Sequence, residues 1–154
     1  MEPLASRIRP ESLEDFVGQR HLVGAGKPLR VGIENKHLLS FIFWGPPGSG
    51  KTTLARIYAR SLGARFYELS AVSAGKDDIR KIARAEANGA HKILFLDEIH
   101  RFKKAQQDSL LPLVESGEIA LIGATTENPS FEIIAPLLSR LRVFVLSELS
   151  GEDM

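Results

Sequence analysis

Cysteine is absent from this chain of 154 residues, which excludes disulfide bonds and any metal site built on thiolates. Long apolar runs are also missing, since no stretch approaches the ~20 residues that a membrane-spanning helix needs. Residues 1–4 (M-E-P-L) lack the basic region and apolar core that open a secretory signal peptide. We therefore expect a soluble, cytoplasmic protein with no membrane partner.

A strong charge of either sign is lacking as well. Twenty Lys and Arg residues nearly balance nineteen Asp and Glu residues, so the net charge is +1. Composition alone therefore makes no electrostatic case for a nucleic-acid-binding protein. The length suits one domain with one core, and 44% hydrophobic with 25% charged residues is typical of a soluble globular protein.

Short apolar runs of strand character alternate with runs of helical periodicity along the chain. The predicted strands cover residues 41–44, 65–70, 91–96, 119–124 and 142–146. The predicted helices cover residues 52–61, 75–88 and 102–116, with a short helix inside 129–140 and a first helical turn at 147–154. Strands that alternate with helices indicate right-handed βαβ units, and hence an α/β fold with a doubly wound parallel sheet of five strands.

The segment G-P-P-G-S-G-K-T follows the first of these strands and leads into an apolar helix. A phosphate chain needs several converging backbone N–H groups, and glycine lets the backbone approach closely and adopt positive φ. The helix that starts at Lys51 adds its positive end, the Lys51 ammonium can reach the β- and γ-phosphates, and the Thr52 hydroxyl can hold Mg²⁺. We predict a nucleoside triphosphate site. Its loop residues are Gly45, Pro46, Pro47, Gly48, Ser49, Gly50, Lys51, Thr52 and Thr53.

Two acids, Asp97 and Glu98, end the apolar run I-L-F-L. Ligands of open α/β sheets lie beyond the carboxyl ends of the strands, where this pair and the glycine loop meet. Asp97 is then placed to coordinate Mg²⁺ beside Thr52, directly or through water, and Glu98 to activate a water molecule as general base. The alternative is a helix N-cap with acids near a positive helix end.

Polar residues also follow the fourth and precede the fifth predicted strand. Thr125, Thr126 or Asn128 could hydrogen-bond the γ-phosphate or the attacking water, although T-T-E-N is also a good turn or helix-cap signal. Arg140 could stabilise charge on a transferred phosphoryl group, including one bound by a neighbouring subunit. An exposed arginine at a helix end is the alternative.

Several motifs together resemble the AAA+ ATPases, which are P-loop NTPases. They are the phosphate loop, D-E-I-H-R-F at 97–102, G-A-T-T-E-N-P-S-F-E at 123–132 and L-L-S-R at 137–140. With residues 4–22, they look most like the replication-associated recombination protein A family, relatives of the Werner-helicase-interacting ATPase, the clamp loaders and the Holliday-junction branch-migration motor.

The resemblance implies a Mg²⁺-dependent ATPase that acts on DNA at stalled or damaged replication forks, associates with the nucleoid and assembles as a homo-oligomer. Replication proteins such as single-strand-binding protein are implied partners. Thr126, with Asn128 as competitor, matches the sensor residue, and Arg140 matches an arginine finger that acts in trans. The adenine-contacting residues match Arg9, Pro10, Val17 and Gly18.

The resemblance also implies a division of the chain. Residues 1–40 would form the adenine-contacting segment, 41–147 the αβα nucleotide-binding core, and 148–154 the start of a helical lid. We therefore expect an AAA+ core without the lid, which in the family carries a second sensor arginine.

The sequence leaves three alternative functions open. Asp97-Glu98-Ile99-His100 resembles the box of a DEAH-type helicase, although the segments at 123–128 and 137–140 do not match helicase motifs. A clamp-loader-like or branch-migration subunit is the second alternative, and a nucleotide-dependent assembly module with little turnover is the third. His100 could contact DNA or transmit the nucleotide state, but a structural role is the favoured interpretation.

Overall fold

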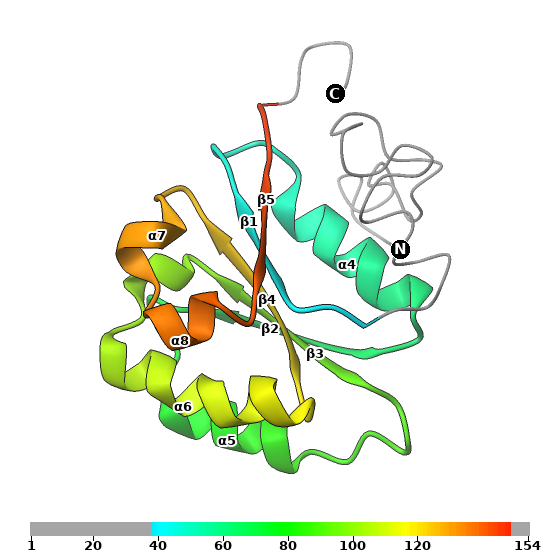
Figure 1. Ribbon diagram of the computed structural model, residues 1–154. Helices are drawn as coiled ribbons and strands as arrows, with labels where there is room; N and C mark the ends of the chain where they lie inside the picture. Colours follow the sequence, from blue (N-terminus) through cyan, green and yellow to red (C-terminus); the bar gives the residue numbers. More distant parts are fainter. Residues whose placement is uncertain (1–37, 149–154) are drawn as a thin grey trace.

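The computed structural model describes residues 38–148. The predictions for Arg9, Pro10, Val17 and Gly18, and for residues 149–154, lie outside this range. Five parallel strands form one sheet in the order β2-β3-β4-β1-β5, which confirms the predicted fold (Figure 1). The strands are β1 (Phe41–Trp44), β2 (Arg65–Ser70), β3 (Lys92–Asp97), β4 (Ala120–Thr125) and β5 (Arg142–Val145).

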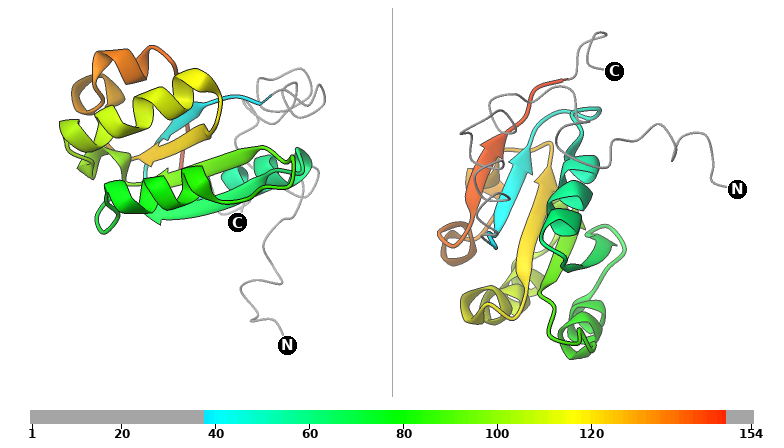
Figure 2. Two further views of the ribbon diagram at one scale, coloured as in Figure 1. Left: turned by 90° about the horizontal axis from the view of Figure 1, so that it is seen from below. Right: turned by 90° about the vertical axis from the view of Figure 1, so that its right-hand side faces the viewer.

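Helices cover both faces of the sheet (Figure 2). Helix α4 (Lys51–Ser61) packs on one face, and α5 (Lys76–Arg84), η1 (Ile99–Arg101), α6 (Lys104–Ser116), α7 (Pro129–Glu132) and α8 (Ala135–Leu138) lie on the other. Successive residues of a strand point to opposite faces, so Ile93 and Phe95 face α4 whereas Leu94 and Leu96 face the opposite layer. Burial on both faces explains why β3 reads as one continuous apolar run.

The order of the strands reverses beside β1. The chain leaves β1 for the far edge at β2, returns through β3 to β4, and then crosses to β5 on the other side of β1. The segment after β1 becomes α4 on one face, whereas the segment after β4 becomes α7 and α8 on the other. A crevice at the carboxyl ends of β1 and β4 results, which is where open α/β sheets bind ligands.

Helix α5 ends earlier than the sequence predicts. It was expected to reach Asn88, but it stops at Arg84, and Ala85 is extended. The Lys92 ammonium donates to the Ile82 and Ala83 carbonyl oxygens at 3.0 and 2.8 Å, which satisfies acceptors that a longer helix would have used. A side chain from the next strand therefore terminates the helix.

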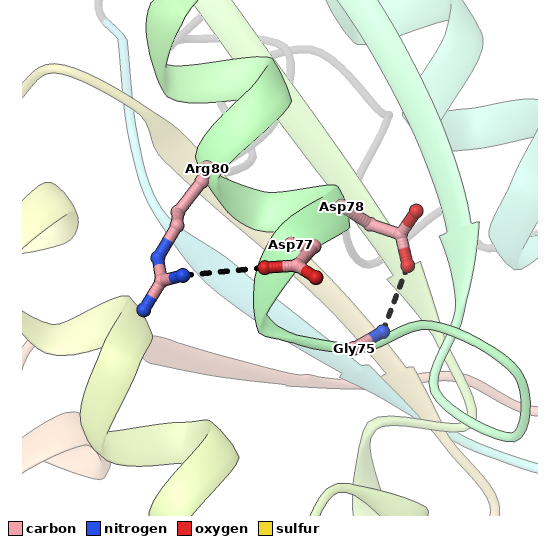
Figure 3. A network of polar contacts seen from close by, with 4 residues as sticks. All are labelled: Gly75, Asp77, Asp78 and Arg80. Carbon is pink, nitrogen blue, oxygen red and sulfur yellow. Dashed lines mark hydrogen bonds and ion pairs between the residues drawn. The ribbon is translucent and has the colours of Figure 1, made fainter.

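The start of α5 is capped locally. The Gly75 N–H donates to the Asp78 carboxylate at 2.8 Å, and Arg80 pairs with Asp77 at 3.2 Å (Figure 3). Acidic side chains in the first turn also interact favourably with the positive helix end. None of the helices within residues 38–148 is long and apolar enough to cross a membrane.

An aromatic cluster anchors the start of β1 on the α4 face. The Phe41 ring lies 5.1 Å from Tyr58 in an edge-to-face arrangement and 5.2 Å from Phe144. The Leu39 N–H donates to the Tyr58 hydroxyl at 2.7 Å, and burial raises the pKa of Tyr58. This cluster joins α4 to β1 and β5 beneath the crevice.

Gln107 is a buried polar residue of α6 that joins this helix to the α7–α8 segment. Its amide nitrogen donates to the Phe102 and Glu132 carbonyl oxygens at 3.0 and 2.9 Å. Its amide oxygen accepts from the Ile134 N–H at 2.8 Å. The sequence pattern pointed to the leucines of this helix and gave no reason to single out Gln107.

We predict that Gln107→Leu lowers the free energy of unfolding by about 2–4 kcal/mol, because it removes these bonds from one buried and two partly buried backbone groups. Urea unfolding measures the change. Asp108→Ala, at the exposed neighbouring position, should stay within about 0.5 kcal/mol of wild type. Equal losses in the two variants would contradict the role of Gln107.

Candidate functional site

Gly45 brings the end of β1 into close contact with both neighbouring strands. Its N–H donates to the Thr125 carbonyl oxygen at 3.1 Å. A Cβ atom at this position would lie 2.6 Å from the Leu146 carbonyl oxygen and 2.9 Å from the Leu146 Cβ, so only glycine fits. Gly48 and Gly50 instead supply positive φ angles of 77° and 88°, which turn the loop into α4.

Lys51 folds back over its own loop. Its ammonium donates to the Gly45 and Pro46 carbonyl oxygens at 2.8 Å each and to the Ser49 hydroxyl at 3.2 Å. The Ser49 hydroxyl in turn donates to the Pro46 carbonyl oxygen at 2.7 Å. Burial lowers the pKa of Lys51, and the Asp97 carboxylate partly offsets that effect. The cation therefore lies between the loop and the end of β3.

A cavity of about 340 Å³ joins the loop to the ends of β3 and β4. It is lined by Pro47, Gly48, Ser49, Gly50, Lys51, Thr52, Thr53, Asp97, Glu98 and Thr126. Residues distant in the sequence thus meet where the crevice opens. Among the predicted site residues that the structure describes, five do not line this cavity: Gly45, Pro46, Thr125, Asn128 and Arg140.

Asp97 and Glu98 leave β3 through a strained turn. Glu98 adopts a left-handed conformation (φ 51°, ψ 45°), and its N–H donates to the Asp97 carboxylate at 2.9 Å. Such a conformation costs a non-glycine residue about 1–3 kcal/mol. The Glu98 side chain makes no capping hydrogen bond to η1, so it does not serve as the N-cap that the sequence left open.

Thr52 and Asp97 supply oxygen atoms to the same cavity. Mg²⁺ usually keeps several water ligands and takes only one or two from protein side chains, so this pair fits the ion. Within residues 38–148 no group of three or more His, Asp or Glu side chains could form a protein-only metal cage.

Thr126 and Asn128 occupy different environments beyond β4. The exposed Thr126 side chain lines the cavity. The Asn128 amide oxygen accepts from the Ser130 N–H at 2.9 Å and caps α7. Asn128 is thus engaged in local structure.

Arg140 lies in the turn between α8 and β5. It pairs with Glu115 of α6 at 3.3 Å, and both side chains are about half exposed, at 56% and 42%. Such a pair is weak because water screens it, so Arg140 is held only loosely.

The sequence grouped Thr125 with Thr126 and Asn128 as a candidate for the γ-phosphate or the attacking water, and gave no sign of its contact with His100. The Thr125 side chain is buried, and its hydroxyl oxygen lies 2.9 Å from His100 Nδ1. Two adjacent threonines gave no reason to rank one as buried. Strand periodicity from Ile122 and Ala124 could have placed Thr125 on the face opposite to theirs.

Comparison with known proteins fits this geometry. Residues 41–149 match the family model described as ATPase family associated with various cellular activities (AAA). The chain belongs to the AAA family. The family implies nucleotide binding, and the phosphate loop lines the cavity together with the strand-end acids Asp97 and Glu98.

Relatives of this AAA chain include replication-associated recombination protein A of Escherichia coli strain K12. It is 55% identical over 157 residues, which cover 99% of this chain and 35% of that protein. ATPase WRNIP1 of Dictyostelium discoideum is 47% identical, over 99% of this chain and 18% of that protein. The predicted resemblance is confirmed, and the chain spans about a third of the length of the bacterial relative.

Solved structures of Thermotoga maritima RuvB share the fold. The P216G mutant superposes with a TM-score of 0.77 at 31% identity, over 94% of this chain and 51% of that chain. The structure described as the RuvB Holliday junction branch migration motor gives 0.74 at 31% identity, over 95% of this chain and 51% of that one.

We predict that Gly45→Ala destabilises the AAA core by about 1–3 kcal/mol and weakens nucleotide binding, because the new methyl group meets the backbone of Leu146. Gly75→Ala is the matched control, since a Cβ there meets nothing within 4 Å. Thermal unfolding and binding of a fluorescent ATP analogue measure both effects. Equal behaviour of the two variants would contradict this account of Gly45.

Proposed function

We propose that this chain is the nucleotide-binding core of a Mg²⁺-dependent ATPase that maintains DNA during replication and recombination. The observation that carries the proposal is the cavity in which the phosphate loop, Lys51, Thr52 and the strand-end acids Asp97 and Glu98 meet. Cation, hydroxyl and carboxylates in one crevice are the groups that phosphoryl transfer from ATP to water requires.

Different residues of the cavity bind the phosphates, hold Mg²⁺ and activate water in the proposed hydrolysis. The loop N–H groups and the Lys51 ammonium bind the β- and γ-phosphates, after Lys51 exchanges the loop carbonyl oxygens for phosphate oxygens. Thr52 and Asp97 would hold Mg²⁺, which neutralises phosphate charge when bound. Glu98 orients a water molecule toward the γ-phosphate and accepts its proton.

Thr126 is the sensor residue that we favour over Asn128. The Thr126 side chain lines the cavity, whereas the Asn128 amide oxygen caps α7. A hydroxyl at this position can hydrogen-bond the γ-phosphate or the attacking water. We also keep the proposal that Arg9, Pro10, Val17 and Gly18 contact the adenine and that residues 1–40, 41–147 and 148–154 are separate parts.

Arg140 acts on the ATP bound by a neighbouring subunit in this proposal. It lies outside the cavity of its own chain and is held only by a half-exposed ion pair. A homo-oligomer would place it against the next site, where a cation stabilises the charge that develops on the phosphoryl group.

DNA as the partner follows from the relatives rather than from the composition. The Escherichia coli relative is called replication-associated recombination protein A, and the RuvB structure is described as a Holliday junction branch migration motor. We therefore propose DNA forks and junctions in the cytoplasmic nucleoid as the place of action, with single-strand-binding protein among the partners.

We predict that Glu98→Gln lowers ATP turnover about 10²–10⁴-fold while ATP still binds, because the amide keeps the shape but cannot accept the proton. Phosphate release by the complete protein, with and without forked DNA, measures this. Wild-type turnover in Glu98→Gln would exclude Glu98 as the base. ATP binding without phosphate release in wild type would favour a nucleotide-dependent assembly module instead.

For Arg140→Ala we expect a loss of turnover of about 10³–10⁵-fold, as is typical for an arginine finger. Mixing Arg140→Ala with Glu98→Gln subunits should restore turnover, since the second variant lends its arginine to the intact base of the first. Arg142→Ala, a nearby exposed arginine on β5, should remain active. Failure of the mixture to recover would argue against action in trans.

A further inference from the structure

The 3₁₀ helix η1, which follows Asp97 and Glu98, contacts β4 at two positions. Ile99 lies over Gly123, where a Cβ atom would be 2.9 Å from Ile99 Cδ1, so the absence of a side chain permits this approach. His100 Nδ1 lies 2.9 Å from the Thr125 hydroxyl. Residues 123 and 125 share one face of the strand, so adjacent residues of η1 contact adjacent positions on that face.

The contacts of the Thr125 hydroxyl define the role of the imidazole. The oxygen accepts from the Glu127 N–H at 2.9 Å and lies 3.2 Å from the Glu127 carbonyl oxygen. A hydroxyl offers one proton and two acceptor lone pairs. If the hydroxyl proton is directed to this carbonyl oxygen, which can only accept, the remaining lone pair faces His100 and the imidazole donates through Nδ1–H. All three capacities of the hydroxyl are then used.

Thr125 contacts two parts of the site: the start of the phosphate loop and the turn that contains Thr126. Its carbonyl oxygen accepts from the Gly45 N–H, which fixes the start of the phosphate loop. Its hydroxyl holds Glu127 on the far side of Thr126, so Thr126 lies in a turn closed at both ends. The buried Thr125 side chain, 2% exposed, has little freedom to find other partners.

We propose that His100 is a positioning residue for ATP hydrolysis, which couples the backbone at Glu98 to the placement of Thr126 through the Nδ1–H bond to Thr125. This inference rests on the proposed function. Glu98 is strained, and η1 follows it directly. A shift of the Glu98 backbone therefore moves His100, and with it the turn that presents Thr126 to the γ-phosphate.

The test compares variants of the complete protein that differ in the hydrogen bond alone. His100→Phe keeps a ring without the donor, and His100→Asn restores an N–H donor near the position of Nδ1. Thr125→Val removes the hydroxyl at nearly constant shape, and Thr125→Ser keeps it. Thermal unfolding confirms that each variant folds, and the Asn and Ser variants carry the test if the other two do not fold.

We expect His100→Phe to lower kcat roughly tenfold or more, with the Kd for ATP nearly unchanged, because misplaced groups slow the reaction without weakening binding. His100→Asn and Thr125→Ser should retain most of the wild-type kcat. In the Thr125→Val background, His100→Phe should cause little further loss, because the bond is already broken. Nitrogen-15 NMR of the imidazole should show a proton on Nδ1.

Several results would overturn the proposal. They are an unchanged kcat in His100→Phe, an equal loss in wild-type and Thr125→Val backgrounds, an Nδ1 without a proton, or His100→Asn and Thr125→Ser as inactive as the variants without the bond. A parallel loss of ATP affinity and kcat would indicate a structural role only. Absence of turnover in the wild-type protein would instead overturn the proposed function.

Discussion

The backbone of Gly45 contacts two neighbouring strands at once, and this contact depends on the absence of a side chain. The Gly45 N–H is bonded to Thr125 of β4, while Leu146, just after β5, occupies the space that a Cβ would need. Three parallel strands are thereby brought into register where they end. The phosphate loop starts at this residue, so these strand contacts fix the position at which the loop begins.

The segments that follow β1 and β4 pack on opposite faces of the sheet, and this packing also determines where the site lies. Helix α4 covers one face, and α5, η1 and α6 to α8 cover the other. The crevice between them brings Lys51 from one layer close enough to Asp97, from the end of β3, for the carboxylate to act on the pKa of the lysine. Strands β1, β3 and β4 are mostly apolar and buried, and the polar residues of the site lie at or just beyond their carboxyl ends. The edge of the sheet at these ends is therefore where a ligand can bind.

The sheet and the phosphate loop were predictable because their signals are local. β1 and β2 match the predicted boundaries, and each end of the other strands matches within one residue, since continuous apolar runs end at polar residues. The end of α5 was not predictable, because Lys92 of another element takes its last carbonyl groups. The same limit applies to Gln107 and Thr125. Gln107 bonds to Glu132 and Ile134, which lie 25 and 27 positions away, and Thr125 contacts His100, which lies 25 positions away. Sequence periodicity carries no information about contacts this distant.

Sequence reasoning left Thr126 and Asn128 as rivals for one role because both can hydrogen-bond a phosphate. Their surroundings differ: the Asn128 amide oxygen caps the start of α7, whereas the exposed Thr126 side chain lines the cavity. Thr125, the last residue of β4, is engaged as well: its hydroxyl contacts His100 of η1, and its carbonyl oxygen accepts from the Gly45 N–H of the phosphate loop. These three polar residues thus have different roles: Asn128 caps α7, Thr125 links η1 to the phosphate loop, and Thr126 lines the cavity. A side chain can remain available to a ligand only if neighbouring residues satisfy the backbone hydrogen bonds around it. Each buried polar group left without a partner would cost about 1–3 kcal/mol.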